Sequence, residues 1–325
     1  FPVMVEVTSS AVSVILPVLN EEDYLEQAVS AILKQDFQGL LEVILAIGPS
    51  RDRTLEIAKS LSEKDSRVKI VDNPTGRTAA GLNLAIAKSI HPIIVRVDGH
   101  ANIPSNYISI AVKLLNDTGA VNVGGVMAAE GVTSFEKAVA RAMRSPLGVG
   151  AAKFHTGGEA GETDTVYLGV FKKEALTAVN GFDEHFTRAQ DWELNFRLRQ
   201  AGGKIYFDPR LTVTYRPRKS LAALAKQYFE YGRWRRVVAR THKGTINARY
   251  LAPPFTVVGT SISLVLGLFN PIFFIPAGVY ATFLIFASAT IGKSLKERFY
   301  LPAILLVMHM SWGVGFITST RRFLR

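Results

Sequence analysis

The stretch VSVILPVLNEEDYLEQAVSAILKQ, residues 12–35, decides the fold class of this chain. Residues 12–19 are rich in Val, Ile and Leu and predict a buried strand. The polar triplet Asn20-Glu21-Glu22 ends that run, and a helix is expected from about Tyr24 to Gln35. A strand that leads into a helix through a short polar loop predicts the start of an α/β unit.

The same order recurs along the first hundred residues. Further apolar strands are expected at LEVILAI (41–47), VKIVDN (68–73) and PIIVRVD (92–98), and helical segments follow the second and third strands. We therefore predict an α/β fold with a mainly parallel sheet and helices on both faces. Ligands bind such sheets at the carboxyl ends of the strands, where the loops NEE, GPSRD, DNPTGR and DGH should gather. Helix N-termini at this edge favour anions.

The C-terminal part has a different composition. No Asp, Glu, Lys or Arg occurs in residues 251–292 or in residues 299–320. A membrane-spanning helix needs about 20 apolar residues, so these runs predict spans at about 251–270, 271–291 and 300–319, with Asn270-Pro271 as a turn. A buried helical hairpin of a soluble protein is the alternative. We expect a multi-pass protein of the cell membrane.

A basic segment precedes the first apolar run. Residues 216–249 hold ten Lys or Arg residues and one acid, Glu230, within a chain of formal net charge +11. Basic residues beside a span favour the cytoplasmic side and anionic headgroups, so the segment predicts lipid binding and a cytoplasmic catalytic domain. No nucleic-acid motif accompanies it, and no nucleic-acid partner is expected. The basic residues Arg321, Arg322 and Arg325 would lie outside after three spans, which conflicts with this bias.

These features predict three regions: a catalytic domain at 1–215, basic juxtamembrane helices at 216–250, and a transmembrane region at 251–325. The Gly-rich stretch 148–163 is a candidate lid over the catalytic site. The chain has 325 residues and no cysteine, which excludes disulfides and thiolate metal sites.

The segment VRVDGHANIP, residues 95–104, places Asp98 directly after a buried strand and His100 two residues later. A tight turn would explain an aspartate and a glycine at a strand end. The alternative is that Asp98 and His100 hold a divalent ion or a ligand at the sheet edge.

The ordered set SVILPVLNEE, GPSRDRT, NPTGRTAAGLNLAI, VRVDGH, NGFDEHFTRAQDWELNFRLRQAG and QYFEYGRWRR resembles family 2 glycosyltransferases of the GT-A fold. It is similar to their membrane-anchored bacterial branch, which includes succinoglycan-type exopolysaccharide glucosyltransferases. The resemblance covers about residues 11–240. It implies inverting transfer from a nucleotide-diphospho-sugar.

On this resemblance Asp98 and His100 match the metal-binding Asp-x-Asp motif, with histidine in place of the second aspartate. A hard divalent cation there stabilises the leaving diphosphate, and imidazole suits Mn²⁺ better than Mg²⁺. Pro17, Asn20 and Glu21 match the first nucleotide loop. Asp52 matches the second aspartate of the next loop, although a charge at a helix N-terminus is the plain alternative.

Other residues are assigned by the same resemblance. Arg77 is expected to contact the base or a phosphate, with a solvated loop arginine as the alternative. Asp191 matches the catalytic base, and Gln190 replaces the glutamate that usually precedes it. Asp191 could also cap a helix from Trp192 to Gln200.

The element around Gln227 resembles the family's Gln-x-x-Arg-Trp motif without its spacing. Arg233 or Arg235 could bind acceptor or donor phosphates, with Trp234 beside them. The alternative places these residues at the membrane surface, with Trp234 at headgroup depth.

The resemblance thus implies transfer of a sugar, with UDP as the expected carrier, to a lipid-linked saccharide at the cytoplasmic membrane face. The product would belong to an exopolysaccharide or another cell-envelope glycan. Two other activities remain open: a polyprenyl-phosphate sugar synthase and a non-catalytic nucleotide-binding membrane regulator. A processive synthase fits less well, because three spans make a poor channel.

Overall fold

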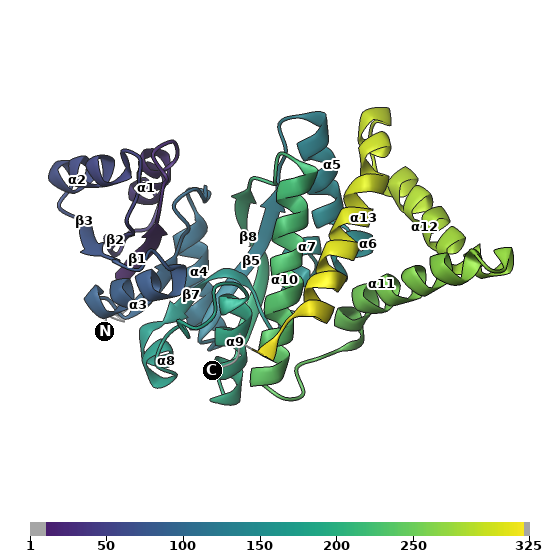
Figure 1. Ribbon diagram of the computed structural model, residues 1–325. Coiled ribbons are helices and arrows are strands. Elements are labelled where there is room, and N and C mark those ends of the chain that lie inside the picture. Colours follow the sequence, from purple (N-terminus) through teal and green to yellow (C-terminus); the bar gives the residue numbers. More distant parts are fainter. Residues whose placement is uncertain (1–10, 322–325) are drawn as a thin grey trace. The chain divides into compact units, whose positions relative to one another are not determined.

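The computed structural model describes residues 11–321, so Arg322 and Arg325 lie outside the described residues. Figure 1 follows the chain from its N-terminal sheet to its C-terminal helices. The chain divides into two compact units. Unit 1 comprises Phe1–Met127 and Gly157–Thr214, and unit 2 comprises Ala128–Thr156 and Tyr215–Arg325. The three predicted regions, 1–215, 216–250 and 251–325, stay a prediction.

Eight strands form one sheet in the order β3-β2-β1-β4-β7-β5-β8-β6. They are β1 (Ala11–Val18), β2 (Leu40–Ile47), β3 (Val68–Asp72), β4 (Ile93–Arg96), β5 (Asn122–Ala129), β6 (Gly161–Glu162), β7 (Tyr167–Lys172) and β8 (Ile205–Tyr215). The pairs β3–β2, β2–β1 and β1–β4 are parallel, as predicted, whereas β7 is antiparallel to both β4 and β5. All four parallel strands therefore end at one edge.

Helices of unit 1 cover both faces of the sheet. They are α1 (Leu25–Leu33), α2 (Thr54–Lys64), α3 (Thr78–Lys88), α4 (Tyr107–Thr118), α8 (Lys173–Ala178) and α9 (Gln190–Gln200). Alternate residues of β1 point to opposite faces, because successive side chains of a strand do so. Val14 and Leu16 pack in a core with α1, α2 and α4, and Ile15 packs in a second core with α3, α8 and α9. This confirms the predicted α/β architecture.

Unit 2 consists mainly of helices. They are α5 (Ser134–Met143), α6 (Pro146–Val149), α7 (Lys153–Thr156), α10 (Leu221–Thr241), α11 (Ala248–Gly267), the 3₁₀ helix η1 (Pro271–Phe274), α12 (Ile275–Ile291) and α13 (Leu295–Thr318). The Gly-rich stretch 148–163 forms α7, the end of α6 and the short strand β6. Its role as a lid stays a prediction.

Within residues 11–321, three helical segments are long and apolar enough to cross a membrane: Ala248–Gly267, Pro271–Ile291 and Leu295–Thr318. They match the three apolar segments expected from the sequence, and Asn270 marks the turn by accepting a hydrogen bond from the amide of Ile272 (3.1 Å). The third helix begins five residues earlier than predicted. The hydroxyl of Ser294 caps it by accepting from the Glu297 amide (3.2 Å), so charged residues 296–298 form its first turns.

Candidate functional site

The loops after β1 and β2 are joined by side chain–backbone hydrogen bonds. The Asn20 amide donates to the Ser50 hydroxyl (3.0 Å), and the Arg51 amide donates to the Asn20 side-chain oxygen (2.8 Å). Asn20 has a φ of +55°, a left-handed conformation that asparagine tolerates better than most residues. The Glu21 amide donates to the Thr54 hydroxyl (2.8 Å). The structure therefore brings the first two predicted nucleotide loops together.

Asp52 is one of the residues that hold these loops. Its carboxylate accepts from the Thr54 hydroxyl (2.6 Å), the Thr54 amide (3.0 Å) and the Glu22 amide (3.2 Å). The hydroxyl of Thr54 contributes most to holding the pKa of Asp52 below its usual range. Since Thr54 begins α2, the carboxylate has the geometry of a charge at a helix N-terminus. Its contact with a nucleotide stays a prediction.

Two other predicted donor residues lie at the same sheet edge. Pro17 is next to the last residue of β1 and pairs with Ala46 of β2. Arg77 is exposed and immediately precedes α3, and its carbonyl accepts from the Asn73 side chain (3.1 Å). Whether Arg77 contacts the nucleotide or is only a solvent-exposed loop arginine therefore stays untested.

Arg96 is the central residue of the site, and it is not among the residues that the motifs predict. It is the last residue of β4 and only 5% exposed. Its guanidinium forms ion pairs with Asp98 (3.2 Å) and with Asp191. Successive strand residues alternate in direction, so Arg96 and Asp98 share a side, and a charge two residues before Asp98 was the signal for this pair. One buried cation thus joins the predicted donor aspartate to the predicted base.

The loop before α9 also contacts Arg96. The Arg96 guanidinium lies over the ring of Phe182 (5.7 Å to the centroid). Asn83 of α3 binds the backbone of Phe182 twice, donating to its carbonyl and accepting from its amide, both at 2.8 Å. The loops after β4 and before α9, together with helices α3 and α9, therefore fix the position of the guanidinium.

The local structure at Asp191 differs from one predicted alternative. Helix α9 begins at Gln190, its N-cap is Ala189, and no side chain caps it. Asp191 therefore lies inside the first turn and does not cap a helix from Trp192. Ala189 has a φ of +61°, a strained conformation for an alanine, and this turn presents Gln190 and Asp191.

Glu193, the next carboxylate along α9, cannot replace Asp191. It is 1% exposed and forms two hydrogen bonds of 2.7 Å with the guanidinium of Arg197, one turn later in α9. Asp191 has an exposed fraction of 27% in its side chain and can meet a substrate.

Asp98 and His100, just after β4, suit a divalent cation whose remaining ligands come from a bound molecule. The side chains of Asp98 and His100 are 21% and 43% exposed. His100 Nδ1 lies 2.7 Å from Glu21 Oε1, an outer contact that would orient Nε2 as the metal-binding nitrogen. Residues 11–321 contain no group of three His, Cys, Asp or Glu side chains that could hold a metal. A cation here would bind one carboxylate and one imidazole, with phosphate oxygens completing its shell.

The predicted acceptor residues of α10 lie in unit 2. Trp234 is only 5% exposed, so its ring packs inside unit 2. Its depth relative to a membrane stays a prediction. Arg235 is equally buried; its guanidinium donates to the Thr245 carbonyl and lies over the Tyr250 ring (3.9 Å). Arg233 pairs with Glu230 (2.8 Å). Their contact with a phosphate stays a prediction.

Comparisons with known proteins agree with this fold. Residues 13–178 match the model of glycosyl transferase family 2. The succinoglycan biosynthesis protein ExoA of Rhizobium meliloti (strain 1021) is 31% identical over 96% of this chain and 95% of its own length. A Methanococcus voltae protein is 24% identical over 94% of this chain and 95% of its own. It is named a dolichyl N-acetyl-α-D-glucosaminyl phosphate 3-β-D-2,3-diacetamido-2,3-dideoxy-β-D-glucuronosyltransferase.

Solved structures share the fold at low identity. The mannosyltransferase PcManGT of Pyrobaculum calidifontis, solved with GDP-Man and Mn²⁺, aligns with a TM-score of 0.64 and 19% identity over 94% of this chain and 87% of its own. TarS of S. aureus, solved with UDP, aligns with a TM-score of 0.53 and 17% identity over 93% of this chain and 90% of that one. With the family match and the full-length similarity to ExoA, they show that the chain is a GT-A glycosyltransferase and belongs to glycosyltransferase family 2.

Proposed function

We propose that this chain moves a sugar, with inversion, from a nucleotide-diphospho-sugar to a lipid-linked saccharide at the cytoplasmic face of the cell membrane. The observation that carries the proposal is the double ion pair of Arg96 with Asp98 and Asp191. It sets an aspartate suited to the donor and an aspartate suited to the acceptor on either side of one buried cation. A binding protein without chemistry has no need for the second carboxylate.

Asp191 acts as the general base in this proposal. Its carboxylate takes the proton from the acceptor hydroxyl while that oxygen attacks the anomeric carbon of the donor sugar. The bond from this carbon to the diphosphate oxygen breaks, its electron pair leaves with the nucleoside diphosphate, and the configuration inverts. Arg96 positions the base and balances its negative charge.

The donor occupies the carboxyl edge of the parallel strands. Asn20 and Glu21, whose loop is fixed to the loop of Asp52, line the nucleoside side together with Pro17, and Arg77 approaches a phosphate or the base. UDP is the expected carrier. Asp98 and His100 would hold a divalent cation, Mn²⁺ or Mg²⁺, which when bound offsets the charge of the leaving diphosphate. The likeness to a structure solved with Mn²⁺ supports this choice of metal.

The acceptor is proposed to be lipid-linked. The name of the Methanococcus voltae relative gives a dolichyl-linked N-acetylglucosaminyl phosphate as its acceptor, and the name of ExoA places that protein in succinoglycan biosynthesis. Gln190, beside the base, and Arg233, Trp234 and Arg235 are the proposed acceptor residues. Residues 1–215 would form the catalytic domain and 251–325 the membrane region. Between them, the basic residues of 216–250 would bind anionic headgroups.

A panel of labelled nucleotide-sugars, tested with the full-length chain, Mn²⁺ and a membrane lipid extract, checks the proposal. We expect label from one donor to enter the lipid fraction. Purified polyprenyl phosphate in place of the extract should accept no label; efficient transfer to it would instead identify a polyprenyl-phosphate sugar synthase. Nucleotide binding with neither transfer nor donor hydrolysis under any condition would contradict the proposal and favour a non-catalytic regulator.

A further inference from the structure

Helix α13 is packed within unit 2 along its whole length, unlike the other two candidate spans. In the most apolar stretch of α13, 39% of the residues are buried, against 17% in each of the other two segments. Leu301, Ile304, Leu305 and Met308 are at most 1% exposed. Helix α13 also contacts α11, where a Cβ atom on Gly313 would collide with the Pro253 carbonyl, and α12, through the 3.0 Å hydrogen bond between Tyr280 and His309. Its remaining neighbours among the described helices are α5, α6 and α10.

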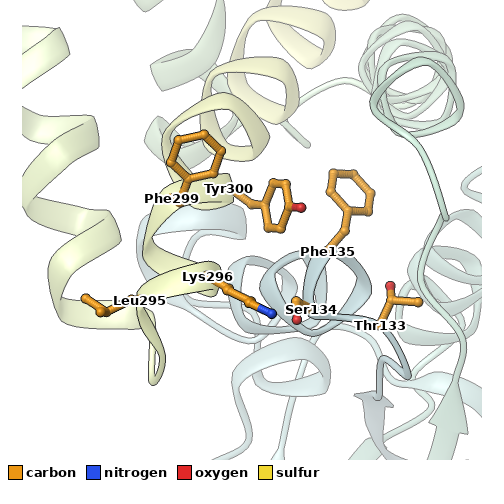
Figure 2. A pocket seen from close by; sticks show the side chains of 7 residues that line it. All are labelled: Thr133, Ser134, Phe135, Leu295, Lys296, Phe299 and Tyr300. Atoms are coloured by element: carbon orange, nitrogen blue, oxygen red, sulfur yellow. The ribbon is translucent and has the colours of Figure 1, made fainter.

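The first half of α13 packs on α5 and α6. Arg141 of α5 pairs with Glu297 (3.7 Å), and the rings of Phe135 and Tyr300 meet edge to face at 5.6 Å. Figure 2 shows these two rings beside each other, at a cavity of about 500 Å³ that Lys296 also lines. Further along, the Leu147 carbonyl lies 2.9 Å from His309 Nε2.

The second half of α13 packs on α10, backbone against backbone. A Cβ atom on Gly232 of α10 would collide with the Trp312 carbonyl, and one on Gly315 would collide with the Phe229 carbonyl. The Ser319 hydroxyl donates to the Arg233 carbonyl (3.1 Å), and the Arg236 guanidinium lies over the Phe316 ring (4.8 Å). Figure 1 shows α10 and α13 running side by side.

Helices α10 and α5 cannot enter the hydrocarbon core together with α13. Helix α10 carries six charged side chains, at Lys226, Glu230, Arg233, Arg235, Arg236 and Arg240. Helix α5 carries Glu136, Lys137 and Arg141. Charged side chains are expensive at the bilayer centre, and a crossing by α13 would take several of them there.

Helices α11 and α12 have the opposite properties. No charged residue occurs from Leu251 to Gly292, and the turn between the helices is apolar and exposed, with Leu268 at 79%, Phe269 at 83% and Ile272 at 60%. The Ser263 hydroxyl donates to the Phe273 carbonyl (2.6 Å) and accepts from the Ala277 amide (3.1 Å). The turn's backbone groups thereby gain partners that lipid cannot provide.

We propose that only the α11–α12 hairpin enters the bilayer, while α13 lies at the cytoplasmic surface of the membrane between α10 and α5. The lipid surface that α10 fits is anionic, because four of the five cations of this helix, all but the buried Arg235, are at least partly exposed. Arg321, three residues after the end of α13, then stays on the cytoplasmic side. This removes the conflict with the positive-inside bias that three spans create. The inference rests on the proposed cytoplasmic position of the catalytic unit.

Cysteine labelling tests the placement, because the native chain has no cysteine that could react. Glu63→Cys, Lys296→Cys and Thr320→Cys place single thiols at exposed positions in α2, in the first turn of α13 and just after α13. We expect an impermeant maleimide to label all three in inverted membrane vesicles and none in right-side-out vesicles. Labelling of Lys296→Cys and Thr320→Cys from opposite sides would overturn the proposal. Orientation is measured without any substrate, so a failure of the glycosyl-transfer proposal is a separate result.

Depth is a second readout that does not depend on side. A fluorophore on Leu306→Cys, in the middle of α13, should be quenched more by lipids brominated near the headgroup than by lipids brominated near the chain end. The matched control is Val265→Cys in α11, which is 56% exposed and should show the reverse preference. Chain-end quenching at both positions would overturn the proposal.

Discussion

The guanidinium of Arg96 contacts the carboxylate of Asp191, 95 residues further along the chain, and also reaches Asp98 at 3.2 Å. A single buried side chain therefore connects the end of β4 to the first turn of α9. Arg96 is almost fully buried and both aspartates are partly exposed, so the guanidinium holds the two carboxylates from the protein side and leaves them accessible to substrate. Loss of this cation would leave two neighbouring carboxylates that repel each other.

Arg96→Gln should therefore lower both activity and stability. Breaking a buried ion pair lowers the free energy of unfolding by about 3 kcal/mol at the lower end of the usual range. We expect this lower value for Arg96→Gln, because both carboxylates reach solvent. Arg96→Lys retains the charge but not the planar fork, so it should restore stability more than turnover. Thermal unfolding and turnover, measured for both variants, check this. Equal recovery of stability and turnover in Arg96→Lys would contradict a positioning role.

Metal dependence should follow Asp98 and His100. A chelator should abolish activity, and Mn²⁺ should restore it better than Ca²⁺, because an imidazole ligand suits Mn²⁺. Asp98→Ala should abolish Mn²⁺-dependent nucleotide binding, measured by calorimetry. Glu21→Gln should weaken Mn²⁺-dependent nucleotide binding about 10-fold, the lower end of the usual effect of removing a carboxylate that hydrogen-bonds a metal-binding histidine.

His100→Ala separates a ligand from a turn residue. If His100 binds the metal, His100→Ala should have a lower affinity for Mn²⁺. Its affinity for the nucleotide in the absence of metal should be unchanged. If His100→Ala binds metal and nucleotide as the parent does, the histidine serves only the turn after β4.

The strained turn before the base gives a stability prediction. Ala189 has a φ of +61°, and a left-handed non-glycine residue costs about 1 kcal/mol. Ala189→Gly should therefore raise the free energy of unfolding by up to about 1 kcal/mol. Ala201→Gly is the matched control, because Ala201 ends the same helix with a φ of −81° and should lose stability. A loss of stability in both variants would argue against strain at Ala189.

Glu42 of β2 predicts how stability depends on pH. Burial raises the pKa of its carboxyl, but hydrogen bonds from Lys69, Ser13 and the Ile90 amide outweigh burial, and the pKa lies below the ordinary 4.5. The ionised form thus stabilises the fold above that value, and this contribution is lost as the pH falls through the lowered pKa. Glu42→Gln should be less stable than the parent by about 2 kcal/mol at pH 7. In urea titrations the difference should shrink below about pH 4.5; a constant difference would contradict this.

The sequence predicted those parts of the fold that local patterns encode. Apolar strands and amphipathic helices identified the parallel half of the sheet, and the absence of charge identified α11 and α12. The insertion of β7 between β4 and β5 depends on pairing between distant segments, which no local pattern reports. For the same reason the packing of α13 on α10 was not foreseen, although its apolar sequence was.

The site shows the same division. Asp98 and Asp191 were found because each stands in a motif, whereas their link through Arg96 joins two distant segments. Arg96 read as an ordinary strand residue, since its sequence neighbours are valines. The hydrogen bonds that hold Asp52 and Asn20 between two loops likewise arise only when β1 and β2 pair.

The most direct test of the central claim is sugar transfer to the lipid fraction by the parent and by Asp191→Asn. The substitution keeps the shape of the side chain and removes the base, so turnover should fall at least about 100-fold, the usual scale for a positioned base. The nucleotide Kd should stay within a factor of about two, and Asp117→Asn, an exposed carboxylate on α4, should behave like the parent. Full turnover in Asp191→Asn, or a loss of nucleotide binding that matches the loss of turnover, would contradict the account.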